Sequence, residues 1–226
     1  VLTRDFSRAY AGEALGAVEV QYKDYAIWQV EGAGREERAE QSGWWKAQFA
    51  GEMPVLNLPY DHGRPAVQDF RGARLAGRLG EETETRLRAF ARRSGVTEYQ
   101  VLLAVFQVLL AKYSGQEDVV VGSPVAGRTH RELEGVVGMF VNTLALRGRP
   151  EAGLSFREYL GQVKAVTVAA FERQGFPFED LVEQVVVRRD FSRNPVFDVM
   201  FAFQNMDAGE VDLGGLKLSG LEIPLA

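Results

Sequence analysis

The stretch Val137-Gly138-Met139-Phe140-Val141-Asn142-Thr143-Leu144-Ala145-Leu146-Arg147 decides the fold class of this chain. Its β-branched and large apolar residues, with Gly and Pro on both sides, predict a buried strand. Strand side chains alternate between two faces, so one face would carry Phe140, Asn142, Leu144 and Leu146. Asn142 is then an amide in an apolar row, and a buried amide without hydrogen bonds costs about 1–3 kcal/mol. It is either a structural amide that bridges two backbone segments or a polar group that faces a ligand in a channel. The residues alone leave both interpretations open.

Helical periodicity and capping signals surround this strand. The predicted helices cover residues 1–10, a segment beginning at 22–28, and residues 36–49, 81–94, 98–114, 156–171 and 177–185. The helix over 98–114 is apolar almost all round, which predicts a central, buried position. Further strands are expected over 70–79, 119–121 and 197–203, with a loop over 122–128 and a final pair of short strands around Gly214-Gly215. The pattern predicts an α/β fold in which helices cover a mixed sheet.

Composition excludes several classes of protein. The net charge is −5 and basic residues are interspersed with acidic ones, which gives no case for nucleic-acid binding. There is no cysteine, so disulfides, thiolate catalysis and zinc–thiolate sites are excluded, and a cytoplasmic protein is expected. No run approaches the ~20 apolar residues of a membrane-spanning helix, and no signal peptide is visible.

The residues that usually carry catalysis are sparse. The only histidines are His62 and His130, and His62 beside Asp61 is a weak acid–base candidate for which an exposed loop pair is the simpler interpretation. No nucleophile elbow, phosphate-binding loop, dinucleotide fingerprint or metalloprotease motif is present. We predict no metal site. The chain begins at Val1 within a helical pattern and ends at Ile223-Pro224-Leu225-Ala226, so we expect a fragment of a larger protein.

Four segments together resemble the condensation domains of non-ribosomal peptide synthetases. The first is Tyr22-Lys23-Asp24-Tyr25-Ala26-Ile27-Trp28, and the second is Val137 to Arg147, which includes Phe140, Asn142 and Thr143. The third is Arg173-Gln174-Gly175-Phe176-Pro177-Phe178-Glu179, with Gly175 where the family more often has Asp. The fourth is Arg189-Asp190-Phe191-Ser192-Arg193-Asn194-Pro195. The four occur in the family's order over nearly the whole chain, which makes the match specific.

The resemblance implies a chloramphenicol-acetyltransferase-like fold with two lobes around a tunnel. The chain would be the C-terminal lobe. Residues 1–69 would form lobe-connecting helices and an extended linker, residues 70–226 the lobe, and the segment after Asn205 a bridge to the other lobe. The family's catalytic motif, His-His-x-x-x-Asp-Gly, would precede Val1 and is not among these residues. The chain alone is therefore expected to be inactive, with no catalytic residue of its own, and its uncovered apolar face is expected to drive self-association.

The resemblance also implies a reaction and its partners. In the family, an acceptor aminoacyl thioester attacks a donor aminoacyl or peptidyl thioester and forms an amide during peptide antibiotic biosynthesis. Both substrates are carried by 4′-phosphopantetheine arms, and no cofactor is bound directly. The implied partners are the missing N-terminal lobe, the donor and acceptor peptidyl carrier proteins and the adjacent adenylation domain. No nucleic acid and no membrane are implied.

Carried over residue by residue, the resemblance places Asn142 toward the reaction centre and makes a tunnel floor of 122–128. The substrate-channel set is thus Asn142, Ser123, Pro124, Gly127 and Arg128. The structural positions of the motifs are Tyr22, Asp24, Trp28, Gly138, Phe140, Thr143, Pro177, Phe178, Glu179, Arg189, Asp190, Arg193, Asn194 and Pro195.

Other members of the superfamily supply alternatives. Epimerisation and heterocyclisation domains differ in the Phe140–Thr143 motif, and the sequence looks most like condensation domains that take an L-configured donor. A lobe of such a related domain remains an alternative. So does a non-catalytic scaffold lobe that only binds carrier protein.

Overall fold

A computed structural model describes residues 1–186, 190–204, 211–212 and 217–218 of the chain. The elements in chain order are α1 (Leu2–Tyr10), α2 (Tyr22–Val30), α3 (Gly32–Gln48), α4 (Glu81–Ser94), α5 (Glu98–Ser114), β1 (Val119–Val125), the short 3-10 helix η1 (Arg131–Leu133), β2 (Asn142–Gly148), α6 (Phe156–Glu172), α7 (Phe178–Val185), β3 (Val199–Met200), β4 (Val211–Asp212) and β5 (Lys217–Leu218). The predicted class, helices covering a small mixed sheet, is confirmed.

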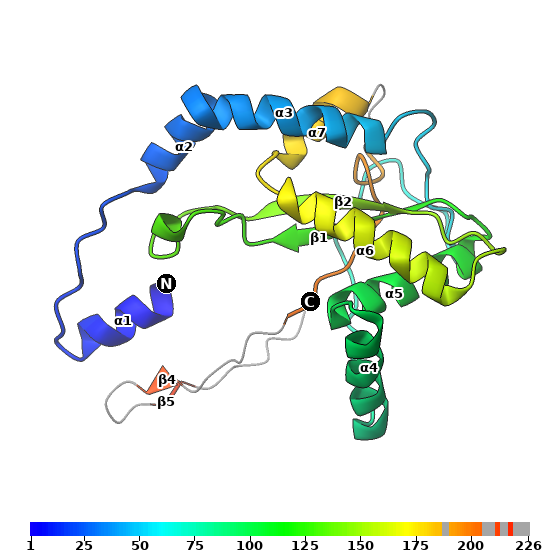
Figure 1. Cartoon of the computed structure of the whole chain (residues 1–226), viewed down its shortest axis with the longest axis horizontal. Coiled ribbons are helices and arrows are strands. Elements are labelled where there is room, and N and C mark those ends of the chain that lie inside the picture. The colour runs from blue at the N-terminus through cyan, green and yellow to red at the C-terminus, as the bar shows by residue number, and fades with distance from the viewer. Residues whose placement is uncertain (187–189, 205–210, 213–216, 219–226) are drawn as a thin grey trace.

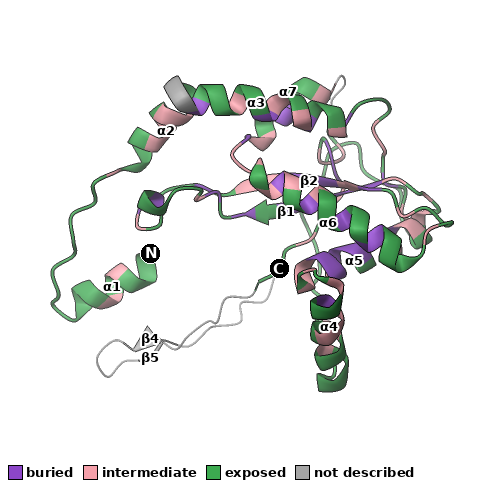
Figure 2. Ribbon diagram, viewed as in Figure 1, coloured by how far each residue is buried: buried purple, intermediate pink, exposed green. Residues whose placement is uncertain are grey.

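The sheet has the strand order β2-β1-β3. β1 pairs with β2 in antiparallel fashion, from Val119 opposite Gly148 to Val125 opposite Asn142, and β3 pairs with β1 in parallel. Helices α3 and α7 lie together along one side of the sheet, while α5 and α6 pack on each other and against the strands (Figure 1). The buried side chains concentrate between these elements, and neither α1 nor α2 contains a buried residue (Figure 2).

The capping signals fix two of these helices. The Thr97 hydroxyl accepts a hydrogen bond from the Gln100 N–H and begins α5, and Ser155 does the same with Glu158 for α6. Both capping boxes are therefore confirmed. The glycines that follow α4 and α5, Gly95 and Gly115, have φ of 63° and 70°, the left-handed conformation that closes a helix.

The predicted strand over 137–147 is only half right. β2 begins at Asn142, and the side chains before it at Val137, Met139 and Val141 are 56%, 73% and 57% exposed. The ladder ends at the pair Val125–Asn142, and at Gly127, whose φ is 65°, the segment that follows β1 passes close to the Phe140 carbonyl without forming a further ladder pair. Residues 137–141 therefore have no neighbouring strand to pair with among the described residues.

The predicted loop over 122–128 is wrong in its first half, since β1 continues to Val125. Pro124 is tolerated inside the strand. The Gly122 carbonyl accepts from the Phe201 N–H on the β3 side, so the missing N–H of Pro124 falls on that side as well. β3 pairs only with Val121 and Gly122 and ends before it reaches Pro124.

Three other predictions, two of strands and one of a buried helix, fail because no other described element pairs with or covers the residues concerned. Residues 70–79 form no strand and are exposed throughout. The strand over 197–203 is reduced to Val199–Met200. Helix α5 is buried on one side only, because Val105, Leu109 and Tyr113 form an exposed row at four-residue spacing. An alternating or all-apolar pattern shows which side chains could be buried, but they are buried only where another element packs on them.

Arg147 fastens the end of α3 to the sheet. Its guanidinium donates to both carboxylate oxygens of Asp118, with the shortest contact 2.7 Å, and to the carbonyls of Gln48 and Glu52 at 3.1 and 3.0 Å. The Arg147 side chain is only 7% exposed, so these partners satisfy a cation that water hardly reaches. One side chain thereby joins the sheet, the end of α3 and the segment after it.

Arg147→Met is expected to lower the free energy of unfolding by about 2–3 kcal/mol, because it leaves two carbonyls and a partly buried carboxylate without their hydrogen-bond donor. Urea denaturation measures the loss. Arg149 is the matched control, because it lies 3.9 Å from the same carboxylate but is well exposed. Arg149→Met should change stability by less than about 0.5 kcal/mol. Equal effects of the two variants would contradict the anchoring role of Arg147.

Candidate functional site

The five residues predicted to line a channel lie together where β1 ends and β2 begins. Ser123, Pro124 and Asn142 belong to the last pairs of the ladder. Gly127 follows, and a Cβ built on it would stand 1.7 Å from the Phe140 carbonyl oxygen. The Arg128 guanidinium lies over the Phe140 ring, 4.2 Å from its centroid, and donates to the Leu133 carbonyl. The structure thus brings the predicted set into one corner of the sheet.

The Asn142 amide is fully hydrogen-bonded to backbone. Its Nδ2 donates to the carbonyls of Gln174 and Phe176 at 2.8 and 2.7 Å. Its Oδ1 accepts from the N–H groups of Thr143 and Phe178 at 2.8 and 3.1 Å. These are the contacts of an amide that bridges two backbone segments, here the start of β2 and the turn between α6 and α7. A role toward a channel stays a prediction.

Ser123 is buried behind Tyr99. The Tyr99 hydroxyl donates to Ser123 Oγ at 2.8 Å, and Ser123 Oγ donates to the Phe201 carbonyl at 3.0 Å. Burial raises the pKa of the Tyr99 phenol, so this hydroxyl keeps its proton and acts as the donor. Pro124, next in the strand, is exposed. Of these two neighbours, Pro124 is the one whose side chain reaches the surface.

The first motif packs directly on the second. The Tyr22 hydroxyl donates to the Met139 carbonyl at 2.9 Å, and its ring meets the Phe140 ring edge-on at 5.1 Å. Gly138 lies so close that a Cβ on it would come within 2.3 Å of the Tyr22 ring. This contact explains why a glycine stands there.

Two other motif positions have local roles in and beside α2. Asp24 accepts a hydrogen bond from the Gln21 N–H at 2.9 Å and caps the helix. Trp28 contacts the His130 ring edge-on at 5.1 Å, so the exposed His130 packs against α2. His62 is exposed as well, as the simpler interpretation predicts.

The third motif supplies the turn that Asn142 holds. Pro177 is the N-cap of α7 and precedes its first residue, one position earlier than predicted. Phe178 donates its N–H to Asn142 and packs its ring against Phe197 at 5.4 Å. Glu179 lies in the first turn of α7, where a carboxylate suits the helix dipole. Three motif segments therefore meet around the start of β2.

The fourth motif makes a separate junction. Asp190 accepts from the Ser192 N–H and hydroxyl at 2.8 and 2.7 Å, which holds the pKa of its carboxyl below the usual value. Arg193 donates to Asp198 at 3.2 Å, and Arg64 contacts the same carboxylate at 3.5 Å. The Asn194 amide oxygen is buried and has no hydrogen-bond partner among the described residues, and Pro195 is exposed. Arg189 lies outside the described residues, as does the predicted bridge except for the paired strands β4 and β5.

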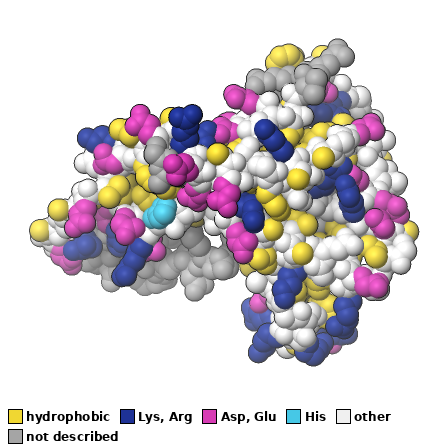
Figure 3. Space-filling model, turned by 45° about the horizontal axis from the view of Figure 1, so that its top comes forward, with side chains coloured by type: hydrophobic (Ala, Val, Ile, Leu, Met, Phe, Trp, Pro, Cys, Tyr) yellow, Lys and Arg dark blue, Asp and Glu magenta, His cyan; other side chains and the backbone are white. Residues whose placement is uncertain are grey.

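A row of exposed apolar side chains beside the site was not predicted from the sequence. The side chains of Val137, Met139 and Val141, at every second position of the segment before β2, are all exposed. Apolar side chains lie at the surface between charged ones on the face drawn in Figure 3. The alternating pattern of residues 137–147 was the available signal, and it was interpreted as a buried strand. No local pattern shows that a partner strand is missing.

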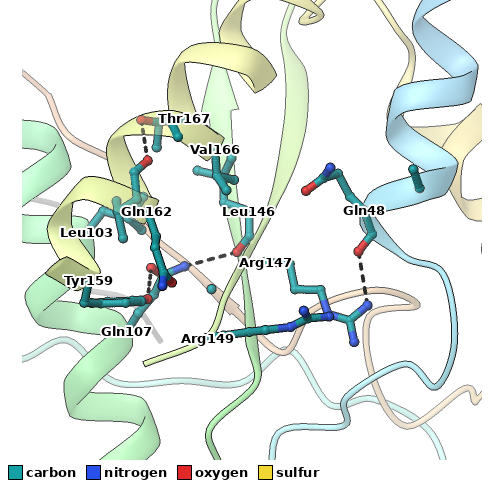
Figure 4. Close-up of a pocket in the computed structure, with 14 residues that line it drawn as sticks. Gln48, Leu103, Gln107, Leu146, Arg147, Arg149, Tyr159, Gln162, Val166 and Thr167 are labelled. Carbon is teal, nitrogen blue, oxygen red and sulfur yellow. Dashed lines mark hydrogen bonds between the residues drawn. The ribbon is translucent and has the colours of Figure 1, made fainter. Parts of the chain in front are cut away.

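Two larger hollows lie elsewhere. A cavity of about 460 Å³ lies between α3, β2 and α6, with Gln107 donating to the Leu146 carbonyl and accepting from Tyr159 at its wall (Figure 4). None of the five predicted channel residues lines it. An open cleft of about 1230 Å³ lies beside α4 and the start of α5.

Within the described part of the chain, no group of His, Cys, Asp and Glu side chains is placed to hold a metal ion. Among the same residues no single helix is long and apolar enough to cross a membrane, and α4 and α5 meet those criteria only as a pair bent by 104°.

Comparison with known proteins gives the relationship. Tyrocidine synthase 3 of Brevibacillus parabrevis is 47% identical over 219 residues, which are 97% of this chain and 3% of that synthase. Gramicidin S synthase 2 of Brevibacillus brevis is 44% identical over 223 residues, 99% of this chain and 5% of that synthase. The chain therefore spans less than a tenth of the length of either relative.

Solved structures agree. A four-domain nonribosomal peptide synthetase bound to AMP and glycine superposes with a TM-score of 0.79 at 29% identity, covering 92% of this chain and 16% of that one. The X-domain from teicoplanin biosynthesis gives 0.77 at 26% identity, covering 88% and 46%. The profile of the Condensation domain family matches residues 1–224. The chain belongs to the condensation-domain family of nonribosomal peptide synthetases, with the fold that the resemblance predicted.

Proposed function

We propose that this chain is the C-terminal lobe of a condensation domain that forms an amide between two carrier-bound thioesters. The observation that carries the proposal is the meeting of three motif segments at the start of β2, around the Asn142 amide. The exposed row Val137, Met139 and Val141 lies beside this corner and offers an apolar wall. A wall of this kind excludes water from a reactive thioester.

The chemistry of amide formation shows which catalytic group must come from outside this chain. The acceptor amine attacks the donor carbonyl, the C–N bond forms, the C–S bond breaks, and the donor thiol leaves with a proton. A base must remove the proton that the amine loses. Among the described residues around Asn142, the amide is committed to backbone and His130 is packed on Trp28. The base would therefore come from the His-His-x-x-x-Asp-Gly motif of the N-terminal lobe, and this chain would position substrate.

The organisation proposed from the resemblance follows. Residues 1–69 connect the lobes, residues 70–226 form the C-terminal lobe, and the segment after Asn205 bridges to its partner. Phosphopantetheine arms of the donor and acceptor carrier proteins deliver the substrates in the cytoplasm, beside an adenylation domain. The donor is L-configured, in keeping with the Phe140–Thr143 motif.

Product formation tests the proposal. The chain is incubated with aminoacyl-loaded donor and acceptor carrier proteins, alone and together with the N-terminal lobe of the same synthetase, and dipeptidyl thioester is measured by mass spectrometry. We expect product only when both lobes are present, at least about tenfold above the single lobes. Product from this chain alone would contradict the assignment of the base to the other lobe. Two active loaded carriers with no product from the reunited lobes would contradict amide formation.

A second candidate is a non-catalytic lobe that only binds carrier protein. Its specific support is that the polar groups at the site corner are already paired, which leaves no free acid or base there among the described residues. Carrier-protein titration followed by NMR separates the two functions. Binding without product from the reunited lobes favours the scaffold, and binding with product favours condensation.

A further inference from the structure

A small hollow borders the turn that the Asn142 amide holds. Its volume is about 10 Å³, and its wall is formed by α2, the first half of α3, Thr129 and Gly175. Gly175 lies between Gln174 and Phe176, the two residues whose carbonyls accept hydrogen bonds from Asn142. The hollow therefore touches the same turn on which the corner of the candidate site depends.

The amide of Gln41, on the α3 side of the hollow, is only half paired. Gln41 is 6% exposed, and its Nε2 donates to the Glu37 carboxylate at 2.8 Å. Its Oε1 is buried and has no hydrogen-bond donor among the described residues. Turning the amide over would not help, because it would set the oxygen against the Glu37 carboxylate. A buried acceptor of this kind is destabilising unless a donor such as an ordered water reaches it.

The neighbours of Gln41 supply one available donor. Arg38 lines the hollow, but its guanidinium is ion-paired with Asp180. Tyr25 lines the hollow from α2. Burial, the neighbouring Tyr22 phenol and the Glu37 carboxylate raise the pKa of Tyr25, so its hydroxyl keeps its proton. The hollow thus has a phenol donor on one wall and a buried amide acceptor on another.

We infer that this hollow binds one water molecule, which donates to Gln41 Oε1 and accepts from the Tyr25 hydroxyl. A volume of about 10 Å³ is the room that a single water needs, and it leaves none for a larger ligand. A buried water makes about three hydrogen bonds, and the Thr129 hydroxyl at the wall can provide the third. The water would join the helix of the first motif to α3, beside the turn of the third motif.

Gly175 keeps the space for this water open. The atoms nearest to an added Cβ are Gln41 Nε2, Gln41 Oε1 and Glu37 Oε1, each at 3.6 Å. A methyl group at Gly175 would therefore fit without a clash, but it would take the room of the water. The inference concerns this chain alone and does not depend on amide formation by the reunited lobes.

Gly175→Ala gives the first test. The backbone of Gly175 is not in the left-handed region, so alanine would by itself stabilise the chain by restricting the unfolded state. We expect the opposite. The equilibrium constant of unfolding, from urea denaturation, should rise about tenfold, because the methyl group excludes the water and leaves Gln41 Oε1 without a donor. Gly43→Ala is the matched control in α3 and should lower that constant, since nothing lies within 4 Å of its added Cβ. An unchanged or lowered constant for Gly175→Ala would overturn the inference.

A double-mutant cycle tests the bridge itself. Tyr25→Phe removes the donor and should raise the unfolding constant about fivefold. If Tyr25 and Gln41 share one water, Tyr25→Phe and Gly175→Ala together should raise it about tenfold, and not the roughly fiftyfold of independent effects. Tyr22→Phe is the control, because the Tyr22 hydroxyl, on the same helix, donates to the Met139 carbonyl at 2.9 Å. Its effect should multiply with that of Gly175→Ala. The same multiplication for Tyr25→Phe would contradict a shared water.

A crystal structure of the parent chain checks the site directly. We expect one ordered water about 2.5–3.0 Å from Gln41 Oε1, and its loss in Gly175→Ala. A parent structure in which Gln41 Oε1 meets a protein donor, or in which no ordered water lies beside it, would show that the hollow has another role.

Discussion

Gly127→Ala is expected to lower the free energy of unfolding by about 3–5 kcal/mol, the largest loss from any single methyl group at the site. Two causes add. Gly127 has φ of 65°, where a Cβ costs about 1–2 kcal/mol. The added Cβ would also stand 1.7 Å from the Phe140 carbonyl oxygen, and neither can rotate away, because the Cβ is bonded directly to Cα and the oxygen belongs to the backbone. The segment at Gly127 and the segment at Phe140 must move apart, which also disrupts the contact between Arg128 and Phe140.

Gly115→Ala separates the two causes, because Gly115 has φ of 70° and nothing within 4 Å of its added Cβ. It should cost only about 1 kcal/mol in the same urea titration. Similar losses for Gly115→Ala and Gly127→Ala would show that backbone strain alone is at work and that the close approach to Phe140 is relaxed in solution.

Asn142→Ala is expected to lower the free energy of unfolding by about 2–4 kcal/mol. The substitution leaves the carbonyls of Gln174 and Phe176 and the N–H of Phe178 without their partner. Asn142→Asp should also destabilise, since it keeps an acceptor for the N–H groups but sets a carboxylate against two carbonyl oxygens. Asn57→Ala, at an exposed position, should change stability by less than about 0.5 kcal/mol.

The activity of Asn142→Ala decides between the two interpretations of this amide. In an intact two-lobed domain, turnover is divided by the folded fraction measured on the same sample. The four backbone contacts lead us to expect turnover per folded molecule within about threefold of the parent. A fall of about tenfold or more with the fold retained would restore the role toward the channel.

Much of the local structure was predictable from sequence, because its causes are local. Capping pairs such as Thr97 with Gln100 fixed helix starts, and glycines such as Gly95 and Gly115 fixed helix ends. The family relationship was carried by four motifs in order, and comparison confirmed it. The predicted site residues Asn142, Ser123, Pro124, Gly127 and Arg128 share one corner because they flank a single antiparallel ladder.

The tertiary structure decided which apolar side chains are buried and which polar groups are hydrogen-bonded within the protein. The stretch from Val137 has the pattern of a strand throughout, yet only the part from Asn142 onward has a partner strand among the described residues, because the ladder with β1 ends at the pair Val125–Asn142. Helix α5 is apolar almost all round, yet Val105, Leu109 and Tyr113 are exposed. Asn142 reaches the turn at 174–178, which lies more than thirty positions away along the chain. Strand pairing and amide partners depend on segments far apart in the chain, and no local pattern records where those segments meet.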